Sequence, residues 1–568
     1  MRGLLPTHVI SGKSVVRYTL PVMTDAPVDA SSPPARSWTR LDLVVMALVT
    51  IVALVPRLTN LLGMDPFIDE AASLDWPLRI YELASPRTWM LSVLSDGRPP
   101  LYLWTIVPVA AVIDNGILAG RVVAVVADAL CAVALYTLGR ELHSRLVGGL
   151  GATLWALSAF PVFFARISVD DSLLTLMAAL TTLAGVHLAR RPTLISGALC
   201  GLCLALTVLT KTNGVLMATA LVLAIVVLGR PLAWRAYLRP VGAAIAVGLL
   251  ASVPLLLGLV PVIQQVSLHT TSSTRSNESL LLANATLAAG WLETLVGNRF
   301  LLLALAGAAL ALAFRQMGMV YLLLLCLGLF AVILEVTASM FARRLLLPVF
   351  PLYLLAGFAI ERAVLLTRYA LHRFDRRFGR SQIARAALSC TIVAAGLWLA
   401  LGERVVLLDA VIRDPVRAEL PGSERAQYFD IWFAQYGMGQ IVEELRALGA
   451  ARPVTVVVPP ASRESRVIVP YLALRYYLRG DPRVRFVEVP ALWRAQDLRD
   501  LRRVARDGPT YLVVNGSYTD GPGMPNDVPA YTHQLERRLA QDVPGAREIV
   551  RIPRPTAPNW LSLYRLDE

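Results

Sequence analysis

Long apolar runs dominate the chain from about residue 41 to 410, whereas residues 411–568 show shorter, mixed patterns. A helix of about 20 apolar residues can cross the roughly 30 Å hydrocarbon core of a bilayer. Such runs predict eleven membrane spans, at 41–62, 121–138, 147–165, 172–189, 193–210, 212–229, 240–260, 299–314, 317–335, 345–363 and 385–409. The pattern therefore predicts an α-helical polytopic membrane protein with a separate domain at 411–568.

One further apolar run, 99–113, is too short for a span and contains three prolines. We interpret it as a re-entrant or interfacial helix. Without it, the basic loops all fall on one side of the membrane, as the positive-inside rule requires. The segment 1–40 is then a cytoplasmic, uncleaved N-terminus, and both the loop 63–120 and the domain 411–568 face outward from the cell (inner or plasma) membrane.

The C-terminal domain alternates β-rich runs with helical ones. The runs 454–459, 484–490 and 510–515 are rich in valine and aromatic residues, and 493–506 has a helical pattern. This alternation predicts a small extracytoplasmic α/β domain. Neither a G-x-G-x-x-G nor a Walker A motif is found, so the sequence predicts no nucleotide site there.

Composition agrees with this picture. Hydrophobic residues make up 56% of the chain and charged residues only 17%, against about a quarter charged in soluble domains. The formal net charge is +14, but positive charge is expected in the cytoplasmic loops of a membrane protein, so we predict no nucleic-acid partner. All five cysteines lie in apolar runs, which predicts no disulfide framework.

Acidic residues gather in the predicted outer segments. Asp69 and Glu70 follow the first span in "MDPFIDEA". Adjacent residues of a helix point in different directions, so this pair fits one catalytic and one orienting group better than a metal-chelating pair. A carboxylate here would serve as the general base for an acceptor hydroxyl or amine. The alternative is an ordinary solvated loop.

Several basic residues also fall on the predicted outer side. Arg98 precedes Pro99 and Pro100, which hold it at the start of the short apolar helix, where a guanidinium would bind a lipid phosphate or simply reach the headgroups. Lys211 is a second phosphate candidate or a cap. Arg343 and Arg344 stand where the positive-inside rule disfavours them, which indicates an anionic ligand.

The turn between the third and fourth predicted spans contains Arg166, Asp170 and Asp171. Charges at membrane depth are costly and usually face a cavity or the protein interior. We expect Arg166 and Asp171 to form a pair that holds the site together. The two aspartates could hold a divalent ion, but we predict no metal site and no cofactor.

Several motifs share one predicted side of the membrane. They are "PFIDEA" (66–71), "GRPPLYLW" (97–104), "ARISVDDSLLTL" (165–176), "LTKTNG" (209–214) and "RRLLLPVFPLYLLAG" (343–357). In this order they resemble the GT-C fold glycosyltransferases, and among them glycosyltransferase family 39. That family comprises the polyprenyl-phosphate-mannose protein mannosyltransferases, and the bacterial aminoarabinose transferases are their relatives. The resemblance covers about residues 41–365.

The resemblance implies that a sugar, hexose or pentose, moves from a polyprenyl-phosphate donor to a lipid, glycan or protein acceptor on the outer face, by a single inverting displacement. It implies that Asp69 is the base or orients the acceptor, that Glu70 completes this acidic motif, and that Arg166, Asp171 and Ser172 match a second motif. Arg98 stands where relatives have His or Lys, and Leu345 replaces a tyrosine beside Arg344. The competing interpretations are a transporter or flippase of lipid-linked sugars, and a receptor-like scaffold for the outer domain.

Overall fold

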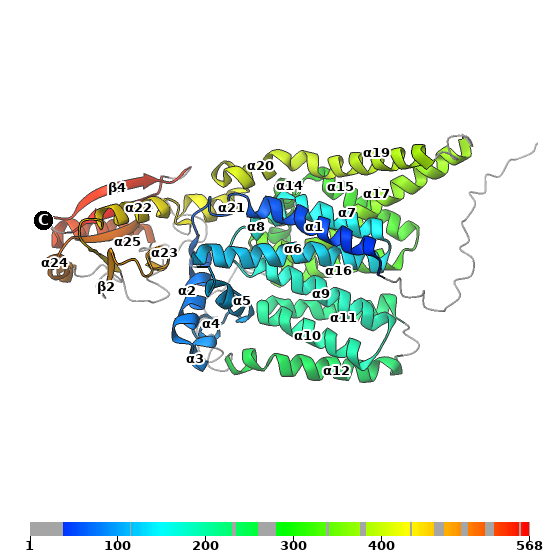
Figure 1. Ribbon diagram of the computed structural model, residues 1–568, viewed down its shortest axis with the longest axis horizontal. Helices are drawn as coiled ribbons and strands as arrows, with labels where there is room; N and C mark the ends of the chain where they lie inside the picture. The colour runs from blue at the N-terminus through cyan, green and yellow to red at the C-terminus, as the bar shows by residue number, and fades with distance from the viewer. Residues whose placement is uncertain are drawn as a thin grey trace, which may run out of the picture. The chain divides into compact units, whose positions relative to one another are not determined.

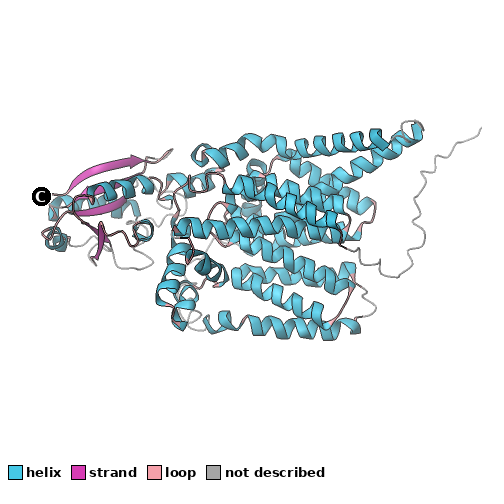
Figure 2. Ribbon diagram, in the orientation of Figure 1, coloured by secondary structure: helices cyan, strands magenta, loops and turns pink. Residues whose placement is uncertain are grey.

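The computed structural model describes residues 38–566, apart from 114, 230–233, 259–279, 337–339, 375–381, 432–433, 459–470, 490–497, 517–527 and 556–557. The predicted N-terminal segment 1–40 therefore lies almost wholly outside the described residues. From Leu41 onward the chain forms one unit. It consists of helices over most of its length and a sheet near the C-terminus (Figure 2).

Long apolar helices make up the part of the chain predicted to cross the membrane, and many of them lie side by side in Figure 1. Their bounds are α1 Arg40–Leu58, α6 Gly116–Leu142, α7 Arg145–Leu157, α8 Ala159–Ala165, α9 Asp171–Arg190, α10 Leu194–Thr210, η1 Thr212–Met217, α11 Ala218–Leu228, α12 Arg235–Ala251, α14 Leu280–Leu295, α15 Asn298–Ala313, α16 Met317–Val336, η4 Ala342–Leu345, α17 Leu346–Phe374, α19 Gln382–Leu401, η5 Gly402–Arg404 and α20 Val405–Arg413. Each predicted span falls on one to three of these helices. The polytopic helical architecture is thus confirmed.

The count of eleven spans is not confirmed. Among the described helices, six are long and apolar enough to cross a membrane, or eight if each of two bent pairs forms one span. The bent pairs are α7 with α8, at 60°, and α14 with α15, at 109°. Helix α14 lies between the predicted spans 240–260 and 299–314, where no span was predicted. Gly297, with a φ of +97°, allows the sharp turn into α15.

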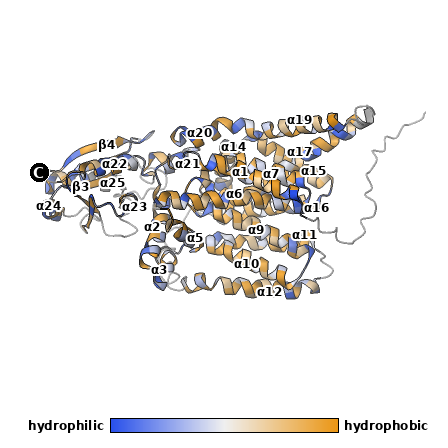
Figure 3. Ribbon diagram, viewed as in Figure 1, coloured by the Kyte–Doolittle hydropathy of each residue, from blue (hydrophilic) through white to orange (hydrophobic). Residues whose placement is uncertain are grey.

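Small residues bring some helices very close together. Gly197 and Gly201 of α10 face α12, and a Cβ atom at either would lie 2.0 Å from a backbone oxygen of Pro240 or Ala244. Only glycine permits this approach, as is common between membrane helices. Farther along the bundle, Arg57 of α1 forms a buried ion pair of 2.5 Å with Asp128 of α6. Apolar colour extends along these helices in Figure 3.

Short helices fill the predicted outer loop 63–120, at the end of the helical bundle where the sheet begins (Figure 1). They are α2 Ile68–Leu83, α3 Pro86–Trp89, α4 Leu91–Asp96 and α5 Leu101–Ala110. Helix α5 has ten residues, about half of what a span needs. Its expected re-entrant or interfacial position stays a prediction.

The C-terminal part is an α/β domain, as predicted. After η6 Pro415–Arg417, α21 Gly422–Arg425 and the π-helical turn η7 Ala426–Asp430, it contains α22 Met438–Leu448, β1 Val454–Val458, α23 Tyr471–Tyr477, β2 Val484–Glu488, α24 Arg499–Ala505, β3 Thr510–Gly516, α25 Val528–Asp542, β4 Arg547–Pro553 and β5 Trp560–Arg565. The strand order is β2-β1-β3-β5-β4. Strands β1, β2 and β3 are parallel, with Val456 opposite Phe486, whereas β4 and β5 are antiparallel. The sequence predicted the first three strands and missed the last two; in β4, three charged residues obscure the apolar pattern.

Asp65 connects this domain to the loop that bears the predicted base. Its carboxylate accepts hydrogen bonds from the backbone N–H groups of Gly437 and Gly439, at 2.9 and 3.0 Å, and from the Tyr477 hydroxyl at 3.1 Å. It therefore caps the N-terminus of α22 from another part of the chain. Because Asp65 is four residues before Asp69, this cap fixes the α/β domain close to the predicted base.

Candidate functional site

Two carboxylates of the site begin helices. Asp69 lies in the first turn of α2 and Asp171 is the first residue of α9. The unpaired N–H groups and the dipole at a helix N-terminus stabilise negative charge. The local fold therefore holds both groups as carboxylates before any side chain approaches them.

These carboxylates belong to a continuous series of ion pairs, which we call the ion-pair chain. It runs in the order Arg98, Asp69, Arg343, Asp171, Lys211, Asp170. The successive nitrogen–oxygen distances are 3.3, 2.7, 3.6, 2.7 and 2.9 Å. Its members come from α2, the turn before α5, η4, the start of α9 and the end of α10. The tertiary structure thus joins residues that the sequence separates by up to 274 positions.

Exposure is lowest in the middle of the ion-pair chain and greatest at its Arg98 end, while Lys211 and Asp170 at the other end are each 22% exposed. The side chains of Arg98 and Asp69 are 37% and 27% exposed, whereas those of Arg343 and Asp171 are 10% and 2% exposed. An anion from outside therefore meets Arg98 and Asp69 first. Arg343 lies behind them and contacts both Asp69 and Asp171.

Two arginines control the protonation of Asp69. Burial raises the pKa of this carboxyl, but Arg343 and Arg98 outweigh burial through their charges and hydrogen bonds, and lower the pKa to about 2. With both arginines in place, Asp69 is a carboxylate throughout the neutral range and a weak base. Its basicity must increase when another anion takes over the arginines.

Arg344 differs from its neighbour Arg343. It is half-buried and lies over the ring of Phe341, with 5.5 Å between Cζ and the ring centroid. Among the described residues, no carboxylate lies within ion-pair distance of it, although Asp171 is near enough to interact electrostatically. Its guanidinium can therefore bind an anion without first breaking an ion pair.

Glu70 has a different environment from Asp69, in agreement with the expectation that the two adjacent side chains diverge. Its carboxylate forms a paired contact with Arg121 of α6, at 2.8 and 2.9 Å, and both side chains are fully buried. The Ser168 N–H donates a further bond of 2.8 Å to it. Glu70 thus ties α2 to α6 and to the turn before α9, and it positions Asp69 without reaching the exposed end of the ion-pair chain.

This geometry predicts a stability role for Glu70. Glu70→Ala would leave Arg121 buried without its partner, which costs about 3–5 kcal/mol. We expect a clearly lower midpoint of thermal unfolding in detergent. The matched control is Glu82→Ala on the same helix. Glu82 forms an ion pair with Arg479 at the same 2.8 Å distance. That pair is exposed and is therefore worth about 1 kcal/mol or less. Equal shifts for the two variants would contradict this role.

Arg166 does not form the pair with Asp171 that we expected. Its guanidinium donates to the backbone oxygens of Pro56, Asn60 and Ile412 at 3.0, 2.8 and 3.3 Å. These oxygens end α1 and α20. Burial lowers the pKa of Arg166 to about 10, so it remains charged at neutral pH. It caps helix ends, where a cation is favoured, and it holds the turn that leads into α9.

Lys211 lies between the two aspartates considered as a metal pair. Its ammonium contacts Asp170 at 2.9 Å and Asp171 at 2.7 Å. The lysine also ends α10, so the expected capping position and the expected charged role coincide. Within the described part of the chain, no group of three or more His, Cys, Asp or Glu residues could hold a metal ion.

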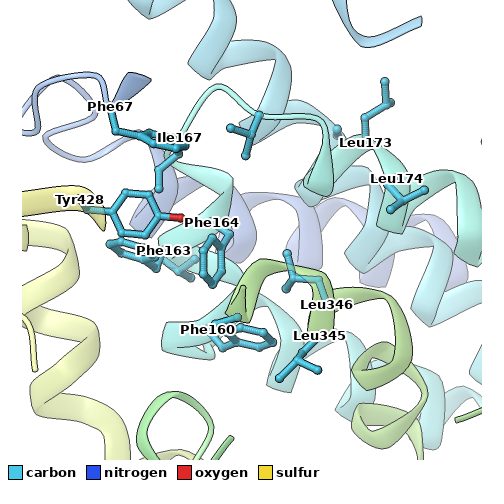
Figure 4. Close-up of a cluster of buried hydrophobic side chains, with 14 of the residues drawn as sticks. Phe67, Phe160, Phe163, Phe164, Ile167, Leu173, Leu174, Leu345, Leu346 and Tyr428 are labelled. Carbon is cyan, nitrogen blue, oxygen red and sulfur yellow. The ribbon is translucent and has the colours of Figure 1, made fainter. Parts of the chain in front are cut away.

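Two residues of the site were missed by the sequence analysis. Glu424 and Tyr428 come from the short segment between α20 and the α/β domain, and their exposures are 1% and 2%. Glu424 accepts a hydrogen bond of 2.8 Å from the Ala342 N–H, next to Arg343. Figure 4 shows the Tyr428 ring beside Phe67 and Phe163, with ring centroids 4.9 and 5.2 Å away. No local pattern marks a glutamate as facing a residue 82 positions earlier in the chain.

A helical membrane bundle, with a charged site at the loop after the first span and an appended α/β domain, is the arrangement of the GT-C fold. Comparisons agree. The model of the dolichyl-phosphate-mannose-protein mannosyltransferase family matches residues 97–257, which include Arg98, Asp171 and Lys211. No curated protein sequence matches the chain.

Solved structures extend the likeness to nearly the whole chain. ArnT from Cupriavidus metallidurans in the apo state is 14% identical, with a TM-score of 0.56 over 92% of this chain and 97% of that one. The structure of the same protein bound to undecaprenyl phosphate is also 14% identical, with a TM-score of 0.56 over 93% of this chain and 98% of that one. The oligosaccharyltransferase of Archaeoglobus fulgidus is 11% identical, with a TM-score of 0.45 over 83% of this chain and 69% of that one. The predicted resemblance to GT-C proteins is therefore confirmed, and the chain shares the fold of ArnT.

Proposed function

We propose that the protein is a membrane glycosyltransferase that moves a sugar from a polyprenyl-phosphate donor to an acceptor on the outer face of the membrane. The observation that carries the proposal is the position of Asp69 between Arg98 and Arg343 at the exposed end of the ion-pair chain. A carboxylate between two guanidiniums provides a base and an anion-binding site in one place. The fold shared with ArnT, whose structure contains undecaprenyl phosphate, supports the lipid-phosphate donor.

In the proposed reaction, the donor phosphate binds Arg98, Arg343 and Arg344, with Lys211 completing the positive charge. The acceptor oxygen or nitrogen attacks the anomeric carbon as the bond from that carbon to the phosphate oxygen breaks. The bonding electrons leave with the phosphate, whose growing negative charge the fixed cations stabilise. Asp69 takes the proton of the acceptor, and a single displacement inverts the anomeric centre.

The geometry also explains how a carboxylate with a pKa of about 2 could act as a base. The same two arginines that lower its pKa are the expected phosphate ligands. When the phosphate takes them over, burial remains and raises the pKa of Asp69. The base is thus activated by the donor, and the acceptor would lose its proton only after the donor has bound.

The direct test is transfer by the purified protein in lipid vesicles. We would supply undecaprenyl phosphate carrying mannose, glucose or 4-amino-4-deoxyarabinose, together with membrane lipid, glycan and peptide acceptors. The proposal predicts release of undecaprenyl phosphate and a glycosylated acceptor with inverted anomeric configuration. If donors instead cross the bilayer intact and none is consumed, the protein is a transporter and the proposal fails.

A further inference from the structure

Several buried polar atoms around Arg343 lack a hydrogen bond within the described structure. Arg343 Nη1, Asp171 Oδ2, Ser172 Oγ and Glu424 Oε2 are buried and have no hydrogen-bond partner among the described residues. The Tyr428 hydroxyl lies near both the Arg343 guanidinium and the Glu424 carboxylate, but it is in hydrogen-bond geometry with neither of them. Native proteins leave few buried polar groups unpaired. A cluster of five around one arginine requires an explanation.

These groups are neighbours although they come from three separate segments. Glu424, Tyr428, Asp171 and Arg343 all interact electrostatically with one another. Ser172 follows Asp171 at the start of α9. Arg343 is the member that also contacts Asp69, at 2.7 Å. The unpaired atoms of Arg343, Asp171, Glu424 and Tyr428 therefore lie directly behind the proposed phosphate-binding end of the ion-pair chain.

The chemistry of the unpaired atoms indicates their ligand. Two carboxylate oxygens require hydrogen-bond donors, the guanidinium nitrogen requires an acceptor, and the two hydroxyls can be either. A phosphate alone would offer acceptors only and would be repelled by Glu424 and Asp171. A sugar ring carries hydroxyl groups, which donate and accept on every side.

We propose that Glu424 and Tyr428, with Asp171 and Arg343, bind the hydroxyl groups of the sugar that the donor carries. This inference rests on the proposed function and adds to it a sugar-binding site built partly from the segment between the membrane helices and the α/β domain. Glu424 uses one oxygen to hold the Ala342 turn and keeps the other for the sugar. Tyr428 uses its ring to pack against Phe67 and keeps its hydroxyl for the sugar.

The test separates the sugar from the phosphate. Binding would be measured for undecaprenyl phosphate alone and for the undecaprenyl phosphate sugar that wild type binds most tightly in the panel above. The variants are Glu424→Gln and Tyr428→Phe, which keep the size of each side chain and the ring packing. The control is Glu443→Gln, because Glu443 is exposed on α22.

We expect both variants to bind the glycosylated donor about tenfold more weakly, since each loses a hydrogen bond to a buried polar group. Binding of undecaprenyl phosphate alone should stay within about twofold of wild type, because the phosphate ligands are unchanged. An equal loss for both lipids would mean that the residues only maintain the fold, and no loss would mean that they do not meet the sugar. Either result overturns the inference. If wild type binds neither lipid, the proposed function itself fails.

Discussion

Asp69→Asn should reduce sugar transfer about a thousandfold, within the range expected for loss of a general base, without weakening donor binding. Asparagine has nearly the same shape as aspartate but cannot take a proton from the acceptor. It also carries no charge, so Arg98 and Arg343 lose the carboxylate that now occupies them at 3.3 and 2.7 Å. Undecaprenyl phosphate should therefore bind as tightly as to wild type, or more tightly.

These opposite effects distinguish a base from a residue that maintains the fold. Transfer rates would be measured at saturating donor, and donor affinity would be measured separately on the same preparation. A variant that loses transfer and donor binding together would contradict the proposed role, as would one that keeps transfer. Asp542→Asn, on α25 in the α/β domain, is the matched control for the substitution itself and should leave both quantities unchanged.

The pH dependence provides a second view of Asp69. In the free protein its pKa is about 2, so the carboxylate stays deprotonated and kcat/KM should show no acidic limb from this group above about pH 3. In the donor complex the arginines are engaged by phosphate, and the pKa should be higher. We therefore expect the acidic limb of kcat to lie at higher pH than that of kcat/KM. Coincident profiles would mean that donor binding does not release the base.

Arg343→Lys should produce the second large loss, of about a hundredfold in transfer, comparable to the removal of a donor that stabilises charge in the transition state. The planar guanidinium of Arg343 contacts Asp69 and Asp171 together and still has one nitrogen free. A lysine ammonium is a single point of charge and cannot bridge both carboxylates while binding a phosphate. Donor binding should weaken as well, in contrast to Asp69→Asn.

Because Arg343→Lys keeps the positive charge, the loss of transfer measures the contribution of the guanidinium geometry. The matched control is Arg413→Lys, because Arg413 is 78% exposed at the end of α20 and the same exchange there should have no effect. If Arg343→Lys retained transfer and donor affinity within about threefold of wild type, Arg343 would not be a phosphate ligand.

Much of the architecture could be read from the sequence, because each part depends on local composition. An apolar run of sufficient length forms a helix wherever it enters a membrane, since its backbone polar groups can be satisfied only internally. Alternating apolar residues gave three strands of the sheet in the same way. Basic residues at predicted outer turns, such as Arg343 and Arg344, stood out because the positive-inside rule disfavours them there.

Local pattern failed where an element depends on distant contacts. Helix α14 forms in a segment where no span was predicted, and it meets α15 at an angle of 109°. Strand β5 forms on the edge of β3, and β4 forms on β5. In β4, Arg547 and Arg551 also hide the apolar alternation. Arg166 was expected to pair with Asp171. Its guanidinium instead donates to backbone oxygens at the ends of α1 and α20.

The sequence by itself determined that this protein is a polytopic helical membrane protein with an α/β domain, and which charged residues are candidates for its site. Only the tertiary structure decided how those charges are divided. It buries Glu70 against Arg121, places Asp69 between two arginines, and brings Glu424 and Tyr428 to Arg343 from a segment 80 residues away. The reason is physical: helix formation depends on neighbours in the chain, whereas the partner of a buried charge is whichever group the packed helices bring within reach.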